Sequence, residues 1–402
     1  MKKNNYKNCF NLIEKQLGQY KIIIIPDYFL LTIRIQSHNL NIYESCFNLD
    51  NLYIFNSFIS NFTIEEIIKY ICESIEQNNI KITKNKKYIK FTFISKIKNQ
   101  SNIELILNKK VKYFINSIKA HNDIISTISI FPSGNIISVS FDQSIKIFDI
   151  HLNVIQVIEK AHDDIILYVD VKNDNNFITC STDKNIKIWI KEENEFKLNS
   201  IIKNAHNDLI YKVVYSNYHL ISCSADKTIK IWENVNNNYQ NITILTHSNC
   251  VYSILLIEDK NILISSGMDG TKFWSLNNFN CLFHIKETWC IYWNSLCRID
   301  VDKIIVQSKY PNTTLKVISI SEKKINDEIK INFYCRGITF IKNKGIILIG
   351  GSKDINIFHK DNYNCIKIIK NADDGLIDGF IGLKNGMVLS YGNNMQIKLW
   401  LI

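Results

Sequence analysis

A histidine, a hydroxyl residue and an aspartate recur together along this chain, and these three residue types can carry out nucleophilic hydrolysis. In one stretch they are His206, Ser222 and Asp226, and Trp232 follows them. A serine hydrolase needs one such trio, with an exposed nucleophile beside an oxyanion hole. This sequence has no G-x-S-x-G motif and repeats the trio instead. The repetition favours a structural role, in which the residues form a buried chain of hydrogen bonds.

Four copies of the set occur at similar spacing. In three of them a tryptophan completes the set, and in the fourth a phenylalanine replaces the indole. The sets are His162, Thr179, Asp183 and Trp189; His206, Ser222, Asp226 and Trp232; His247, Ser265, Asp269 and Trp274; and His121, Ser138, Asp142 and Phe148. Buried polar groups that lose a partner cost more than a satisfied bond contributes, so such residues tend to occur as complete sets.

The sets belong to a longer repeat with a period of 41–43 residues. Its anchor positions are Phe148, Trp189, Trp232, Trp274, Val317, Phe358 and Trp400. Each copy holds short runs of alternating β-branched residues, such as IKIW and LISCS, between polar turns. A repeat of this kind resembles the WD40 repeat, in which each copy forms one four-stranded blade of a β-propeller. The resemblance covers residues 111–402 and implies an all-β, seven-bladed WD40 propeller.

The ends of the repeat region predict how the ring closes. The last copy stops just after its third strand, at Trp400. Residues 111–118 precede the first histidine segment as an outer strand does in later copies. We therefore expect the strand at 111–118 to complete the last blade and leave no unpaired inner edge.

Residues 1–110 show no repeat and are expected to form a small α+β module. Strands are predicted at 28–36, 39–48, 80–83, 87–95 and 102–108. The segment 62–77 has an isoleucine stripe at helical spacing, and Thr63 and Glu66 form a capping box at its start. No family suggests itself for this module.

Positive charge is concentrated in the first part of the chain. Residues 1–118 carry 17 Lys and Arg and 9 Asp and Glu, so they hold +8 of the net charge of +10. Seven lysines lie in 81–98 with no acidic residue among them. They suit nucleic acid, anionic lipid or an acidic protein. The favoured interpretation is a solvated hairpin face, because no arginine accompanies the lysines.

Other features restrict the class of protein. No apolar run approaches the roughly 20 residues that a membrane span needs. Eleven cysteines without a C-x-x-C pair, and the lack of a signal segment, predict an intracellular protein, either cytoplasmic or nuclear. No phosphate loop, metal cluster or catalytic constellation is evident, so neither a cofactor nor enzyme activity is expected.

The resemblance implies that partners bind on the face carrying the loops before the innermost strands. Alignment of the copies puts Ser126, Leu167, Tyr211, Tyr252, Tyr292, Arg336 and Asp378 near the mouth of the central channel, with Trp289 and Trp293 close to Tyr292. Nearby acids are Asp123, Asp163, Asp164, Asp208, Asp373 and Asp374. Aromatic rings flanked by carboxylates suit a basic side chain. We expect a peptide with Arg or Lys over Tyr211, Tyr252 and Tyr292; the alternative is that the rings pack between blades and plug the channel.

The last three copies depart from the pattern. Ser352 and Asn394 occupy the Asp position, and Val317 and Phe358 occupy the Trp position. We expect this part of the ring to be the least stable, unless its residues differ because they contact a partner.

The sequence therefore predicts a non-catalytic scaffold whose propeller binds a protein or peptide. Two alternatives stay open. One is a substrate receptor of a ubiquitin ligase, for which Lys191 after Trp189 is the nearest match to a basic residue following the Trp-Asp pair. The other is an RNA-associated factor that uses the lysines of 81–98.

Overall fold

A computed structural model of the chain divides it into two compact units, Met1–Tyr113 and Phe114–Ile402. The structure describes residues 114–402, apart from 237, 309–313 and 385, and seven strands in the first unit.

The described strands of the first unit form two antiparallel sheets. One contains β1 (Ile13–Leu17), β2 (Tyr20–Pro26), β3 (Leu30–Ser37) and β4 (Ile42–Asn48), and the other contains β5 (Ile80–Lys84), β6 (Tyr88–Phe93) and β7 (Ile103–Asn108). Strands β3 to β7 lie where strands were predicted, whereas β1 and β2 were not predicted. The continuous isoleucine run of β2 lacks the alternation by which a strand is recognised. The helix predicted at 62–77 lies outside the described residues.

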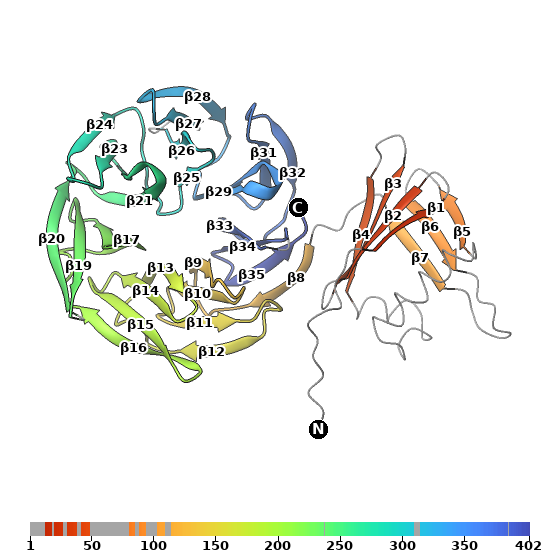
Figure 1. Ribbon diagram of the computed structural model, residues 1–402, viewed down its shortest axis with the longest axis horizontal. Coiled ribbons are helices and arrows are strands. Elements are labelled where there is room, and N and C mark those ends of the chain that lie inside the picture. The colour runs from red at the N-terminus through yellow and green to blue at the C-terminus, as the bar shows by residue number, and fades with distance from the viewer. Residues whose placement is uncertain are drawn as a thin grey trace. The chain divides into compact units, whose positions relative to one another are not determined.

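The second unit is a ring of seven four-stranded antiparallel sheets, as Figure 1 shows, so the predicted all-β, seven-bladed propeller is confirmed. From the channel outward, the first three blades are β9 (Ile125–Ile130), β10 (Ile136–Ser140), β11 (Ile145–Phe148) and β12 (Val154–Ile158); β13 (Ile166–Asn173), β14 (Asn176–Ser181), β15 (Ile186–Glu192) and β16 (Glu195–Ile202); and β17 (Ile210–Tyr215), β18 (Leu220–Ser224), β19 (Thr228–Val235) and β20 (Asn238–Thr246).

Blades four to seven follow in the same order. They are β21 (Val251–Ile257), β22 (Ile262–Gly267), β23 (Gly270–Ser275) and β24 (Cys281–Ile285); β25 (Leu296–Arg298), β26 (Lys303–Gln307), β27 (Thr314–Ser319) and β28 (Lys324–Lys330); β29 (Gly337–Ile341), β30 (Ile346–Gly350), β31 (Ile355–His359) and β32 (Cys365–Ile369); and β33 (Ile377–Gly382), β34 (Val388–Gly392), β35 (Gln396–Trp400) and β8 (Phe114–Lys119).

The seventh blade is built from both ends of this unit. Strand β8 pairs antiparallel with β35, with Ile118 opposite Ile397, and the rings of Phe114 and Trp400 are 5.4 Å apart. The closing strand expected at 111–118 is therefore found at 114–119. Pairing within the last sheet joins the ends of the ring and leaves no inner strand unpaired.

The anchor residues pack against the preceding blade and sit beside a bulge between the third and fourth strands. Trp189, for example, belongs to a core cluster with Phe131 of blade one. In blade five the bulge falls between Val317 and Ile318, and Ile318 packs with residues of blade four. The anchor of this blade is therefore Ile318 rather than the predicted Val317, which faces blade six instead. The sequence has no aromatic residue there to mark the register.

The inner strand of blade five differs from the other inner strands. It contains three residues, β25, and the segment before it is irregular. Tyr292 lies in this segment, not on the inner strand as the alignment predicted. Leu296 of blade five and Ile254 of blade four are equivalent in register. Tyr252 stands two residues before Ile254, and Asn294 stands two residues before Leu296. Asn294, not Tyr292, is therefore the residue of blade five that matches Tyr252. The irregular segment thus brings Tyr292 and Trp293 forward into the channel mouth.

The described helices are two 3₁₀ turns, η2 (Glu258–Lys260) and η3 (Lys342–Lys344). In this described part, no helix has the length and apolarity required to cross a membrane. The described cysteines are free thiols, and Cys180, Cys223, Cys290 and Cys335 are buried.

Candidate functional site

The predicted histidine sets lie on one side of the ring, which carries the loops before the inner strands; we call it the histidine face. In blade two, His162 Nδ1 is 2.8 Å from Asp183 Oδ2, His162 Nε2 is 2.8 Å from Thr179 Oγ1, and Trp189 Nε1 donates to that hydroxyl at 2.9 Å. Equivalent atoms lie 2.6–3.0 Å apart in the sets of His206, Ser222, Asp226 and Trp232; of His247, Ser265, Asp269 and Trp274; and of His121, Ser138 and Asp142.

Burial and the indole bond distinguish these hydroxyls from a catalytic serine, although the histidine and the aspartate are arranged as in a triad. A carboxylate only accepts hydrogen bonds, so the histidine carries its proton on Nδ1 and accepts at Nε2 from the hydroxyl. The hydroxyl oxygen accepts in turn from the indole, and Thr179 and Ser222 are fully buried. Each set is therefore a closed structural chain with no exposed reacting atom.

Ionisation states support this assignment. Burial lowers the pKa of His162, His206 and His247, although the neighbouring aspartate opposes the shift. Burial alone raises the pKa of Asp183, but hydrogen bonds and charge from His162 and backbone N–H donors outweigh it and lower that pKa to about 2. At neutral pH the pair is a neutral imidazole bonded to a carboxylate.

Blade seven has a hydrogen-bond network at the same place, but an aspartate replaces the histidine and an asparagine replaces the aspartate. Asp373 stands at the histidine position and Asn394 at the aspartate position, and the Asn394 amide donates to Asp373. Lys398 Nζ lies 3.4 Å from Asp373 Oδ2, and Trp400 Nε1 donates to Ser390 Oγ at 2.8 Å. Asp373 is therefore buried and engaged inside the blade, and it is not one of the partner-facing acids that the sequence suggested.

Blade six has lost the network. Ser352 Oγ receives the backbone N–H of Asp354 and the side-chain amide of Asn356, both at 3.2 Å, and Phe358 has no donor to add. These contacts stay within one turn. Nothing comparable to the long histidine chain therefore links the strands of this blade.

Trp293 crosses the central channel and bonds to distant blades. Its Nε1 donates to Ser126 O of blade one at 3.0 Å. Its carbonyl accepts from Ser253 Oγ of blade four at 2.8 Å and from Lys212 Nζ of blade three at 3.4 Å. The ring stacks on Tyr211 with centroids 6.5 Å apart. One residue of blade five thus contacts three other blades.

Asn294 continues this connection toward the other side. Its side-chain amide donates to Tyr391 Oη of blade seven at 3.1 Å, and its carbonyl accepts from Ile338 N of blade six at 2.8 Å. We call Trp293 and Asn294 the channel brace. Together they touch blades one, three, four, six and seven.

The predicted tyrosines separate into two groups. The rings of Tyr211 and Tyr252 lie 4.3 Å apart, and Tyr211 also stacks on Trp293. Tyr292 lies apart from that pair, under the guanidinium of Arg336, with Cζ 5.1 Å from the ring centre. The ring face expected to receive a partner's cation is already used by a cation of the chain itself.

The other predicted residues vary in exposure. Ser126 and Leu167 are buried, and Ser126 Oγ donates to Ile166 O at 2.6 Å. Trp289 is half-buried, and its backbone N–H donates to Gln307 O at 2.9 Å. The side chains of Ser126, Leu167 and Trp289 therefore belong to the packed wall around the channel and do not form an open surface.

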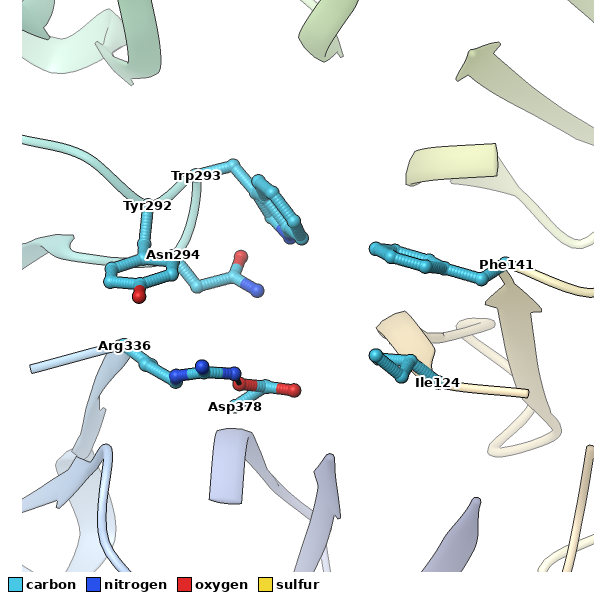
Figure 2. Close-up of a pocket in the computed structure, with 7 residues that line it drawn as sticks. All are labelled: Ile124, Phe141, Tyr292, Trp293, Asn294, Arg336 and Asp378. Atoms are coloured by element: carbon cyan, nitrogen blue, oxygen red, sulfur yellow. Dashed lines mark hydrogen bonds and ion pairs between the residues drawn. The ribbon is translucent and has the colours of Figure 1, made fainter. Parts of the chain in front are cut away.

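A pocket of about 230 Å³ opens where blades one, five, six and seven meet at the histidine face. It is lined by Ile124, Phe141, Tyr292, Trp293, Asn294, Arg336 and Asp378. Figure 2 shows Trp293 and Phe141 projecting toward each other from opposite sides, with Arg336 and Asp378 side by side. Arg336 Nη1 donates to Asp378 Oδ1 at 2.7 Å. The pocket therefore has apolar walls and one internally neutralised polar pair.

Exposed acids surround the inner edge of the histidine face. Asp123, Asp164 and Asp208 each stand two residues before an inner strand, and each accepts the backbone N–H of the next residue at 2.7–2.8 Å. Asp163 and Asp374 are exposed in the equivalent loops. We call these five residues the acidic rim. It comes from blades one, two, three and seven.

The features behind the alternative interpretations are not among the residues of this pocket or of the acidic rim. Lys191 is exposed on β15 and has its ammonium 6.0 Å from the centre of the Phe196 ring. Of the lysines in 81–98, three lie on β5 and β6 and the rest fall outside the described residues. Within the described part of the chain, no group of three His, Cys, Asp or Glu residues could hold a metal ion.

Comparison with protein families gives one match. The model described as "WD domain, G-beta repeat" matches residues 112–149, 153–189 and 198–233. These ranges cover β8 and most of the first three blades, and they leave out β20, the last strand of blade three. None of the curated proteins compared with the chain matches it. WD40 propellers generally act as protein-interaction scaffolds and are typically not catalysts. The WD40 repeats matched within 112–233 and the seven-bladed ring together support assignment to the WD40 β-propeller family.

Proposed function

We propose that this protein is a non-catalytic scaffold that holds a peptide segment of a protein partner on its histidine face. The pocket between blades one, five, six and seven receives one bulky side chain of that segment. The acidic rim attracts basic residues that flank it. The observation that carries the proposal is the pocket itself, an aromatic-walled hollow at the inner edge of that face.

The size and lining of the pocket favour a side chain over a cofactor. Sites for small molecules and cofactors usually measure about 300–1,000 Å³, which exceeds this pocket of about 230 Å³. Aromatic residues bury a large area with little loss of rotamer freedom, and they dominate the energetics of protein interfaces. Phe141, Tyr292 and Trp293 supply such walls.

The position of charge supports a partner with basic residues. Five exposed carboxylates lie along the inner edge of the histidine face, whereas the single arginine in the pocket is paired with Asp378. Exposed carboxylates accelerate encounter with basic partners and disfavour acidic ones. Basic side chains therefore belong on the rim, and the apolar anchor belongs in the pocket.

Affinity capture with the intact chain tests this proposal. Ile124→Asp places a charge in the pocket wall, and Ile150→Asp makes the same change at an exposed position of blade one outside the pocket. We expect the proteins retained by the unmodified chain to be retained by Ile150→Asp and lost from Ile124→Asp. Equal retention by both variants would place the partner elsewhere.

A further inference from the structure

We infer that the pocket selects a tyrosine side chain of the partner. This inference rests on the proposed function, and it names the residue that the pocket receives. It is carried by the size of the pocket, by the flat apolar walls and by the ion pair at one end.

The dimensions suit a single six-membered ring. An apolar cavity of roughly 150 Å³ in a protein takes up benzene. At about 230 Å³, this pocket has room for that ring, a hydroxyl and the linking methylene group. Trp293 and Phe141 project toward each other across the opening, and Ile124 lies beside Phe141, so an inserted ring meets apolar side chains on both sides.

The ion pair provides both a donor and an acceptor. Arg336 has five N–H donors and Asp378 has two carboxylate oxygens, and the bond between them uses one of each. The two side chains are 25% and 11% exposed, so each retains a small accessible surface. A phenol hydroxyl both donates and accepts, so it can donate to Asp378 and accept from Arg336 at the same time.

Competing side chains fit less well. Phenylalanine would fill the space but would remove water from the ion pair without replacing its hydrogen bonds, which is costly. A lysine or arginine would meet the guanidinium of Arg336. Phosphotyrosine would bring a dianion next to Asp378. Because the pair keeps some contact with water, we expect discrimination of about 10-fold to 100-fold between tyrosine and phenylalanine.

The test uses pools of synthetic peptides and the full chain. Each pool has one fixed central residue, either tyrosine, phenylalanine, leucine or phosphotyrosine, between randomised positions and two lysines on each side. A glycine pool is the reference. Retention on immobilised protein is measured for the unmodified chain, for the double variant Arg336→Met with Asp378→Leu, and for Tyr218→Ser. Tyr218 is 84% exposed on blade three and serves as the control. Circular dichroism checks that each variant is folded.

We expect the tyrosine pool to be retained at least 10-fold better than the phenylalanine pool by the unmodified chain and by Tyr218→Ser. In the double variant this ratio should fall to about one, while the phenylalanine pool is still retained. Removing an ion pair in favour of apolar residues of similar size is often well tolerated, which makes this variant suitable.

Two other results have different meanings. Equal retention of the tyrosine and phenylalanine pools, or preference for phosphotyrosine, would overturn the inference and leave the scaffold function standing. If no pool is retained above the glycine reference, the pocket is not a peptide anchor and the proposed function fails with the inference.

Discussion

Blades one to four and blades five to seven hold their strands together in different ways. The first group uses four histidine chains of nearly identical geometry, each buried within its own blade. The second group has an exchanged network in blade seven, short local bonds in blade six and a three-residue inner strand in blade five. The channel brace links this second group to the first through the middle of the ring.

This difference suggests that the two groups of blades are stabilised by different kinds of contact. In each of the first four blades, a polar chain links the strands within the blade. Blades five and six have no such chain, and the contacts that the channel brace makes between blades lie beside the pocket. The departures from the repeat therefore coincide with the pocket that we propose as the binding site.

The largest expected difference between the two regions concerns the network aspartate. Asp226→Ala removes bonds to His206, to Thr228 and to two backbone N–H groups, and it leaves buried donors without partners. We expect the free energy of unfolding to fall by about 3–4 kcal/mol. Ser352→Ala, at the matched position of blade six, should cost about 1 kcal/mol or less. Urea unfolding measures both losses, and equal losses would contradict the difference between the two groups of blades.

The channel brace should be the next largest contributor. Trp293→Ala removes a half-buried indole, its bond to Ser126 O and its stacking on Tyr211. The expected loss is about 2–3 kcal/mol, below the range for a fully buried tryptophan. Hydrogen exchange should show that protection falls most in blades five to seven. A loss confined to blade one would mean that the indole supports Ser126 alone.

Acid should weaken blades two to four more than blades five to seven. The pKa of His162, His206 and His247 is lowered in the folded state. Below about pH 6.5, the ordinary pKa of histidine, the unfolded chain therefore binds more protons than the folded chain, and the stability that these groups contribute declines as pH falls. The pKa of Asp183 is lowered to about 2, so its contribution declines below about pH 4.

One buried acid acts in the opposite direction. Burial raises the pKa of Asp170 to about 6, so its protonation favours the folded state as pH falls through that value. Hydrogen exchange at pH 7.5 and 5.0 should show loss of protection in blades two to four, and Asp170→Asn should enlarge that loss. Equal loss in blades five to seven would count against the histidine networks as its cause.

The smallest expected effect concerns the acidic rim. Converting Asp123, Asp164 and Asp208 together to asparagine preserves the shape of the loops and removes three charges. We expect association with a lysine-flanked peptide to slow about threefold to 10-fold at low salt, with little change in the dissociation rate. Surface plasmon resonance at two salt concentrations separates the two rates. A change in dissociation alone would show that these carboxylates contact the bound peptide.

The architecture could be predicted from the sequence because the repeat period, the anchor residues and the histidine sets are local and periodic. Blade five was misaligned because it has neither an aromatic anchor nor a histidine to mark the register. Ile318 and Asn294 therefore took positions that the alignment gave to Val317 and Tyr292. Strands β1 and β2 were missed for a different reason, since their residues do not alternate clearly between apolar and polar.

The pocket was only partly visible in the sequence. Arg336 and Asp378 occupy the same position in adjacent blades with opposite charges, and that signal predicts an ion pair. Phe141 and Trp293 meet only because the ring closes and an irregular segment enters the channel, which no local pattern indicates. The exchange of histidine for Asp373 likewise becomes interpretable only when its partners Asn394 and Lys398 are placed beside it.

The most direct test is hydrogen exchange on the full chain with a captured partner or a selected peptide bound. We predict added protection around Ile124 and Phe141, across Tyr292, Trp293 and Asn294, and next to Arg336, with the outer strands β12, β16 and β20 unchanged. Protection confined to the outer strands, with the pocket segments unaltered, would contradict the assignment of the binding site.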